Sequence, residues 1–417
     1  MHKKLVYTIG SIANIFECYE FSVYANLAGI IATQFFPHGN LQTNLIKVFL
    51  LFAVSYFIKP LGGIFWGYIG DYYSKAAVMR WSLVMMAVPT FFIGLLPNYQ
   101  HIGALSTILL LFLRLLQGFA MGGELPGSAC YLYELSEKKD RRFHCSFVSA
   151  SSMLGMLCGA SLVMLLHLLL NNQQMQSWGW RLPFFLGLPL AGFIYWFRKN
   201  IISTAISVTK TNQNTHSKLS HFKFLLKNNL QSLLTVITLN SFIVVSYYLL
   251  FLWMPTYMIY YLKISESAAH LSTTISLIFL IIFTLLIGKY SSCFTRKFMI
   301  LSSLLSIGVL LFPLFYLLNN SSIKYIYIIQ IIFALALSFA KGVSMETMTS
   351  LFNSKIRCLG MSLGFSLSLA IFGSMAPSLA SYFIEKFNSN MAPIFIIFGV
   401  IILALPFILL LNNKQQP

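Results

Sequence analysis

The chain has 417 residues, of which 58% are hydrophobic and only 9% are charged, and its mean hydropathy is +0.77. Soluble domains carry about 25% charged residues, so this composition excludes a soluble protein. The formal net charge of +18 is typical of nucleic-acid-binding proteins, but here the basic residues fall between apolar runs. Membrane topology explains that placement, and we expect no nucleic-acid partner.

Apolar runs separated by short polar breaks extend along almost the whole chain. A helix needs about 20 mostly apolar residues to cross a bilayer. We therefore predict an all-α integral membrane protein with twelve transmembrane helices. In chain order, the predicted helices lie near 5–36, 45–69, 78–97, 104–134, 143–170, 181–198, 230–261, 267–290, 297–318, 323–351, 357–386 and 391–412.

One long polar segment, 199–229, is rich in Ser, Thr, Asn and Lys and separates the first six predicted helices from the last six. Such a composition is typical of a linker. We predict an N-terminal six-helix half at 1–198, a cytoplasmic linker at 199–229 and a C-terminal six-helix half at 230–417.

Basic residues are unevenly distributed over the predicted loops. With both termini inside, the inner side receives most of them, including the lysines of the linker. Cytoplasmic loops of membrane proteins carry such an excess of Lys and Arg, so we predict that both termini are cytoplasmic. The outer loops receive only Arg181, Lys263, Lys324 and Lys386.

Two acids and one base fall at the predicted depth of the bilayer centre. Glu17 and Glu20 lie roughly 18 to 22 Å from the inner end of the first helix, on one face. Arg114 lies roughly 15 Å from the outer end of the fourth helix, at the same level. A buried carboxyl group beside a competed guanidinium can bind and release a proton near neutral pH. We predict that Glu17 or Glu20 carries a proton and that Arg114 is its partner or clamps a substrate carboxylate.

The alternative is a static Glu–Arg pair that holds the first and fourth helices together. Because two acids compete for one Arg, a static pair leaves one acid unpaired, which is unfavourable in the membrane. In the second half, Lys341 is either a substrate-binding cation or a residue that snorkels to the inner surface. Tyr247 and Tyr248 either donate hydroxyl groups to a ligand or pack in the core.

The fourth predicted helix carries two further acids and several glycines. Glu124 and Glu134 fall near the cytoplasmic surface, and we expect them to pair with Arg141 or Arg142 in the next loop. G-x-x-x-G pairs allow close contact between membrane helices. The pairs here include Gly118 with Gly122 on the fourth helix and Gly155 with Gly159 on the fifth.

Several motifs together resemble one transporter family. The fourth helix reads RLLQGFAMGGE from Arg114 and YLYE from Tyr131, the first reads NIFECYEFSVY from Asn14, the second KPLGG from Lys59, and the sixth WGWRLPF from Trp178. This combination is similar to the metabolite:proton symporters of the major facilitator superfamily. The resemblance implies alternating access between two halves and proton symport of zwitterions such as proline and betaine, or of organic acids such as 2-oxoglutarate and citrate.

The resemblance also implies locations and roles. It implies a bacterial cytoplasmic membrane, and a substrate site to which we assign Asn14, Tyr24 and Gln117 together with Arg114, Lys341, Tyr247 and Tyr248. The loop after the second helix resembles the conformational latch of the superfamily, although its cationic part is reduced to Lys75. We assign to the latch Gly67, Gly70, Asp71, Lys75, Glu134, Arg141 and Arg357.

No catalytic constellation, zinc-ligand spacing or phosphate-binding G-x-x-x-x-G-K-[ST] loop occurs in the sequence. We therefore expect neither an enzyme nor a metal or cofactor, with the proton gradient as the driving force. The expected partners are a small-molecule substrate, protons and the lipid bilayer, and we expect a functional monomer. The alternatives are a transport-inactive sensor with the transporter fold, or an antiporter or exporter.

Overall fold

The computed structural model describes residues 2–36, 41–205, 225, 227–320 and 323–411. Its contacts divide the chain into two compact units: unit 1 is Met1–Tyr131 with Ser151–His221, and unit 2 is Leu132–Ala150 with Phe222–Pro417. Most of the predicted linker at 199–229 lies outside the described residues, so the predicted boundaries of the two halves stay a prediction.

The helices of unit 1 correspond to the first six predicted spans, with the first span broken at Leu27. In this unit α4 and α1 both pack against α9, and α2 packs against α3. The helices are α1 (His2–Asn26), α2 (Ala28–Phe35), α3 (Leu41–Tyr72), α4 (Lys75–Leu95), α5 (Tyr99–Ile102), α6 (Ala104–Leu135), α7 (Arg141–Leu169), α8 (Asn172–Ser177), the 3-10 helix η1 (Gly179–Arg181) and α9 (Leu182–Ala205); α6 and α7 extend into unit 2.

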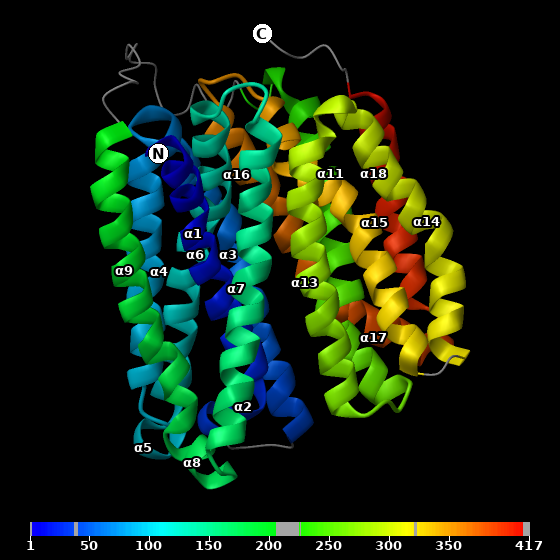
Figure 1. The fold of residues 1–417 in the computed structure, drawn as a ribbon. Helices are drawn as coiled ribbons and strands as arrows, with labels where there is room; N and C mark the ends of the chain where they lie inside the picture. The colour runs from blue at the N-terminus through cyan, green and yellow to red at the C-terminus, as the bar shows by residue number, and fades with distance from the viewer. Residues whose placement is uncertain (1, 37–40, 206–224, 226, 321–322, 412–417) are drawn as a thin grey trace. The chain divides into compact units, whose positions relative to one another are not determined.

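The helices of unit 2 correspond to the last six predicted spans. Here α15 lies between α13 and α14, which run beside it (Figure 1). The elements are α11 (Leu230–Tyr247), the π-helical η3 (Tyr248–Leu252), α12 (Met254–Thr256), the π-helical η4 (Tyr257–Tyr261), α13 (Glu266–Tyr290), the 3-10 helix η5 (Ser291–Cys293), α14 (Arg296–Asn320), α15 (Ile323–Ser350), α16 (Arg357–Ser368), the π-helical η6 (Leu369–Gly373), α17 (Ala376–Phe387) and α18 (Pro393–Leu409).

Two predicted helices of unit 2, 230–261 and 357–386, are not uniform α-helices. Each contains a π-helical segment shortly before a proline: η3 before Pro255 and η6 before Pro377. The first also contains η4, which follows Pro255. Proline has no N–H to donate and its ring crowds the preceding turn. A locally widened turn accommodates that crowding and keeps the helix continuous.

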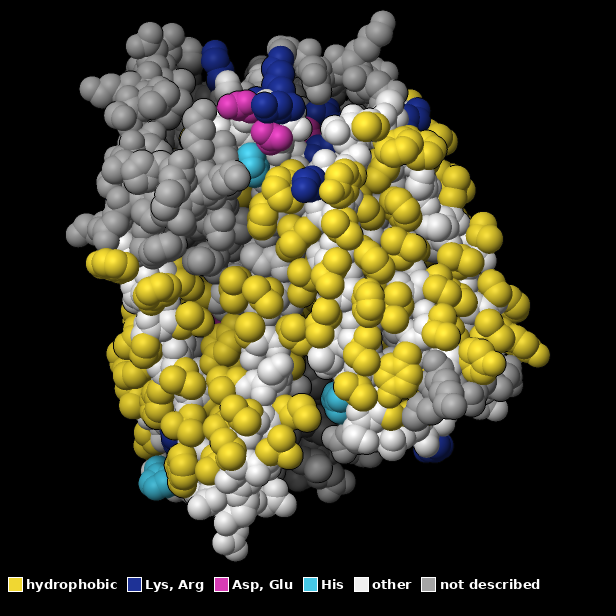
Figure 2. Space-filling model, viewed as in Figure 1, with side chains coloured by type: hydrophobic (Ala, Val, Ile, Leu, Met, Phe, Trp, Pro, Cys, Tyr) yellow, Lys and Arg dark blue, Asp and Glu magenta, His cyan; other side chains and the backbone are white. Residues whose placement is uncertain are grey.

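The outer surface of unit 2 is apolar along its helices. Figure 2 shows hydrophobic side chains over the helices of this unit, with the acidic and most of the Lys and Arg side chains in view at one end. On α14, Leu305, Val309 and Phe312 are all strongly exposed, and a continuous apolar surface of this kind is unfavourable in water. Within the described residues, eight helices are long and apolar enough to cross a membrane. The predicted all-α membrane protein is confirmed.

Candidate functional site

The candidate site of unit 1 begins with the two acids of α1. Glu17 and Glu20 are both buried. The opposite side of α1 lies directly against α7, because the carbonyl oxygens of Ile15 and Tyr19 occupy the space that a side chain at Gly155 or Gly159 would need. The predicted close contact at this G-x-x-x-G pair is confirmed.

Glu20 is held by side chains of α6. Its Oε1 accepts a hydrogen bond from Nε2 of Gln117, which also donates to Oγ1 of Thr90 at 3.0 Å. Arg114 Nη1 lies 3.7 Å from the same Oε1. This distance is an ion pair rather than a hydrogen bond, so Arg114 neutralises Glu20 while Gln117 orients it.

Arg114 is positioned by an aromatic ring. Its guanidinium carbon lies 3.4 Å from the ring centroid of Tyr24, a favourable cation–π contact. The residue is 1% exposed, yet its Nε and Nη2 have no hydrogen-bond partner in the described part of the chain. A buried guanidinium with unused N–H groups can bind a carboxylate in a bidentate manner.

Glu17 has a different partner from the one that the sequence suggested. Lys59 of α3 donates from Nζ to Oε1 of Glu17 at 2.8 Å, and both side chains are buried. The expectation that both acids compete for Arg114 is therefore wrong: among the described residues, Glu17 pairs with Lys59 and Glu20 pairs with Arg114. A basic residue inside the apolar run of the second span was the signal that could have identified Lys59.

Close helix packing places Lys59. An added Cβ at Gly122 would lie only 2.6 Å from the carbonyl oxygen of Lys59, so α3 and α6 contact each other backbone to backbone. The Trp66 indole adds a hydrogen bond to the Phe119 carbonyl at 3.1 Å. The predicted role of Gly122 in close packing is confirmed, and it gives the Lys59 ammonium a buried position between helices.

Glu124 does not lie at the surface. It is fully buried, and Oγ of Ser82 on α4 donates to its Oε2 at 2.6 Å. The expected position near the surface is wrong because Glu124 faces α4, where Ser82 covers it, and lies 11 residues, about 16 Å, before α6 ends at Leu135. Asn14 is also buried, and its Nδ2 lies 3.4 Å from Oγ of Ser151.

The candidate residues of unit 2 lie on α15 and α11. Lys341 is buried, and its Nζ lies 4.1 Å from the ring centroid of Tyr247. Tyr247 and Tyr248 are buried as well, with ring centroids 6.0 Å apart. The ammonium of Lys341 thus contacts an aromatic face inside the unit rather than reaching the surface.

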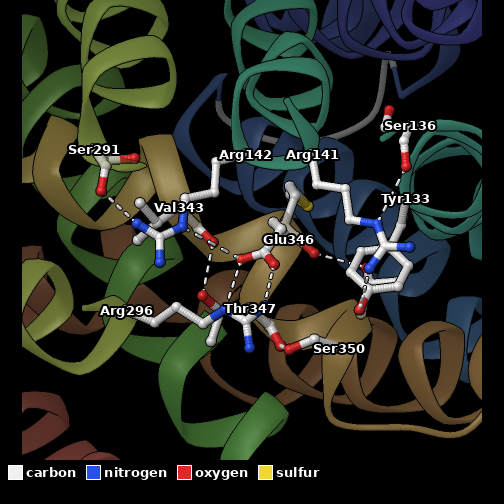
Figure 3. Close-up of polar contacts among 12 residues, drawn as sticks. Tyr133, Ser136, Arg141, Arg142, Ser291, Arg296, Val343, Glu346, Thr347 and Ser350 are labelled. Carbon is white, nitrogen blue, oxygen red and sulfur yellow. Dashed lines mark hydrogen bonds and ion pairs between the residues drawn. The ribbon is translucent and has the colours of Figure 1, made fainter. Parts of the chain in front are cut away.

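A second charged cluster of unit 2 joins α7, α14 and α15 (Figure 3). Arg296 donates from Nε to Oε2 of Glu346 at 2.9 Å, and Arg142 Nε lies 3.9 Å from the same oxygen. Arg142 also donates to the carbonyl oxygens of Ser291 and Phe294. No local pattern in the sequence assigns a role to Glu346.

The predicted latch residues divide between the units. In unit 2, Arg357 Nη1 lies 2.6 Å from Glu134 Oε1. The guanidinium groups of Arg141 and Arg357 lie 4.4 and 4.8 Å from the ring centroid of Tyr133. Glu134 thus pairs with a residue outside the loop that the sequence suggested. In unit 1, Gly67, Gly70 and Asp71 lie in the last part of α3, and Lys75 is the first residue of α4.

Comparisons with known proteins identify the family of the chain. The family model described as Major Facilitator Superfamily matches residues 11–262 and 246–417. The glycine betaine/proline/ectoine/pipecolic acid transporter OusA of Dickeya dadantii is 30% identical over 406 residues, which are 95% of this chain and 81% of that protein. The proline/betaine transporter of Escherichia coli K12 has the same identity and coverage.

A relative from a third genus extends this similarity. The putative proline/betaine transporter of Staphylococcus haemolyticus is 30% identical over 405 residues, covering 96% of this chain and 86% of that protein. Among solved structures, the proton:xylose symporter XylE has a TM-score of 0.75 at 15% identity, over 97% of this chain and 95% of that chain. At this identity the likeness to XylE concerns the fold.

Proposed function

The chain belongs to the major facilitator superfamily, and from that premise we propose that it is a proton-coupled symporter for a small zwitterion that bears a carboxylate, such as proline or a betaine. It is a multi-pass membrane transporter and not an enzyme. The observation that carries the proposal is Arg114: a buried guanidinium whose Nη1 faces Glu20 while Nε and Nη2 have no hydrogen-bond partner among the described residues.

Glu20 is the proton carrier in this proposal, and Arg114 links it to the substrate. When Glu20 is ionised, Arg114 is its counter-ion. Protonation of Glu20 removes that attraction, so the guanidinium can bind a substrate carboxylate through its parallel N–H groups. Substrate and proton are then bound together, and loss of either one favours release of the other.

Glu17 takes no part in this exchange of partners. Its hydrogen bond to Lys59 is 2.8 Å long, whereas the nearest nitrogen of Arg114 is 3.7 Å from Glu20. The tighter pair holds α1 against α3 with no net buried charge. The looser pair suits a carboxyl group that gives up its cation to the substrate in every cycle.

The class of substrate follows from the charges of the site and from the relatives. Arg114, whose Nε and Nη2 can hold one carboxylate, suits a substrate with one carboxylate better than a di- or tricarboxylate. The names of the relatives from Dickeya dadantii and Escherichia coli include proline and betaine. In unit 2, Lys341 and Tyr247, which contact each other, are further groups for the substrate. The ammonium can bind a carboxylate, or the aromatic face can bind a quaternary ammonium in place of Lys341.

The surrounding assignments complete the proposal. We place the protein in a bacterial cytoplasmic membrane with both termini inside, and it works as a monomer. The end of α3 and the start of α4, with Gly67, Gly70, Asp71 and Lys75, act together with Glu134, Arg141 and Arg357 as the latch of alternating access. Each proton that enters with a zwitterion contributes about 2.3 kcal/mol per 100 mV of membrane potential, which supports uptake against a gradient.

Transport by the purified protein in liposomes tests the proposal. With an imposed proton gradient, labelled proline or betaine should accumulate, and citrate should not. Glu20→Gln should abolish accumulation but keep exchange of labelled for unlabelled substrate across the membrane. The matched control is Glu137→Gln, at an acid whose side chain is 56% exposed, which should accumulate substrate normally. Accumulation by Glu20→Gln at the wild-type level would place the proton site elsewhere.

A further inference from the structure

Unit 1 contains a third buried carboxyl group, Glu124, which the proposed exchange between Glu20 and Arg114 does not use. Glu124 lies seven residues after Gln117 on α6. Seven residues are about two helical turns, so Glu124 and Gln117 lie on nearly the same face. Gln117 binds Glu20, and this face of α6 therefore presents both groups toward the same side.

Contacts between three helices give the order of the acids. Along the contact between α3 and α6 the residue numbers of both helices increase together, so these two helices are parallel. Along the contact between α3 and α1 the residue numbers of α3 increase while those of α1 decrease, so α1 is antiparallel to both. The ascending contacts are Ser55 with Gly118 and Lys59 with Gly122, and the descending ones are Tyr56 with Phe21 and Lys59 with Glu17.

In this arrangement Glu17 lies between the other two acids in depth. Gln117 and Glu20 contact each other and therefore lie at one level. Glu17 precedes Glu20 by three residues, about 4.5 Å along α1, and Glu124 follows Gln117 by seven residues, about 10.5 Å along α6. Because the two helices are antiparallel, both displacements are in the same direction. Cα–Cβ bonds of a helix tilt toward its N-terminus. Since the two helices are antiparallel, the Glu17 and Glu124 side chains tilt toward each other's level.

Electrostatic interactions link Glu17 to the other two carboxyl groups. Glu17 interacts electrostatically with both Glu20 and Glu124. Oε2 of Glu17 and Oε2 of Glu20 are buried and have no hydrogen-bond partner among the described residues, so each offers an oxygen that can receive a proton. The partner of Glu17 is the ammonium group of Lys59, and the hydroxyl group of Ser82 donates a hydrogen bond to Glu124.

We infer that Glu124, together with Ser82, is a second proton-binding station of the transporter, which receives the proton from Glu20 by way of Glu17 and passes it toward the C-terminal end of α6. This inference rests on the proposed proton symport. In each step one carboxylic O–H bond breaks and one forms on the next carboxylate. Glu20 then pairs again with Arg114, and Glu17 pairs again with Lys59.

The contact with Ser82 suits this role. A serine hydroxyl can donate to a carboxylate or accept from a carboxylic acid, so the same contact stabilises Glu124 in both protonation states. An ammonium partner, which can only donate, would favour the ionised state alone. The station therefore binds and releases a proton without a rearrangement of α4 and α6.

Proton movement and substrate exchange, measured separately in liposomes, test the inference. With a pH-sensitive dye inside, Glu124→Gln should slow substrate-driven proton entry by on the order of a hundredfold, the lower range for removal of a proton-transfer group. Substrate exchange should persist, because it needs no net proton movement. Glu124→Asp should recover part of the proton entry, and Glu137→Gln should match the wild type.

The outcomes separate the two proposals. If the wild type moves no protons with substrate, the proposed symport fails. If the wild type does but Glu124→Gln moves protons equally fast, the station alone is wrong. Loss of exchange in step with proton entry would also overturn it, since that indicates a structural role. If Glu124→Gln does not fold, Ser82→Ala decides: slower proton entry at unchanged exchange supports the station, and unchanged proton entry overturns it.

Discussion

Lys59 Nζ lies 2.8 Å from Glu17 Oε1, so the acid that the sequence left without a partner has a cation of its own. Both side chains are buried, with 3% and 5% of their surfaces exposed. A buried pair of this kind is neutral as a whole, but either member alone is a buried charge. A single substitution therefore measures the cost of leaving one charge unpaired. Replacing both residues is needed to measure what the pair itself contributes to stability.

Single changes at this pair should destabilise the protein strongly. We expect Glu17→Gln or Lys59→Met to cost about 3 to 5 kcal/mol, because each leaves one charge uncompensated. The double variant Glu17→Gln/Lys59→Met should be close to the wild type. Thermal unfolding of the purified variants in detergent measures the three changes. Additive losses in the double variant would show that the two side chains are not coupled.

The two roles of Arg114 give different outcomes for Arg114→Lys. As a clamp, Arg114 uses a planar fork that an ammonium cannot reproduce. The change should then weaken substrate binding by on the order of 2 kcal/mol, about thirtyfold in affinity. Equilibrium binding of labelled proline at saturating proton concentration measures this effect. Unchanged affinity together with a shifted pH profile of uptake would instead make Arg114 a partner of Glu20 alone.

Depth along a helix could be predicted from the sequence, but the direction in which a side chain points could not. Counting 1.5 Å per residue correctly brought Glu20 and Arg114 to one level, and they form an ion pair. The rise per residue does not determine the rotation of α3 about its axis, and therefore not which side of α3 faces α1. The Glu17–Lys59 pair depends on that rotation, which the packing of α3 on Gly122 determines.

Glu346 in unit 2 could not be identified from the sequence, because its partners come from helices that meet only in the folded chain. Glu346 lies in the last part of α15, where an acid normally faces water. Arg142 at the start of α7 and Arg296 at the start of α14 both meet it. These three positions are far apart in the chain, and no local pattern relates them. Helix ends that gather at one place therefore remain the hardest part of such a site to predict.

Glu346→Gln should leave the two arginines facing each other. We expect a loss of about 1.5 to 3 kcal/mol, the usual contribution of hydrogen bonds to charged groups. Thermal unfolding measures the loss, and a second change, Arg296→Gln, should recover part of it. The matched control is again Glu137→Gln, whose exposed pair with Lys139 should contribute less than about 1 kcal/mol. Equal losses in both variants would contradict the burial argument.

The orientation of the chain is open to a labelling test. Single cysteines introduced at Ser217, within the predicted linker, and at Gln173 on α8 should react from opposite sides of the membrane. Because cytoplasmic loops are rich in Lys and Arg, we expect Ser217 inside and Gln173 outside. The exposed native Cys158 and Cys293 must first be replaced by serine. Labelling from the reverse sides would overturn the predicted topology.

Gly122→Ala should separate α3 from α6 and thereby displace Lys59. The added Cβ would lie 2.6 Å from the carbonyl oxygen of Lys59, and backbone atoms have little freedom to move away. Overpacking of this kind costs about 1 to 3 kcal/mol. Gly127→Ala on the same helix is the matched control, since its Cβ would meet Val78 at an ordinary 3.4 Å and should gain up to about 1 kcal/mol from helix propensity. Thermal unfolding should therefore move in opposite directions in the two variants, and a Gly122→Ala protein as stable as Gly127→Ala would show that the helices have room to spare.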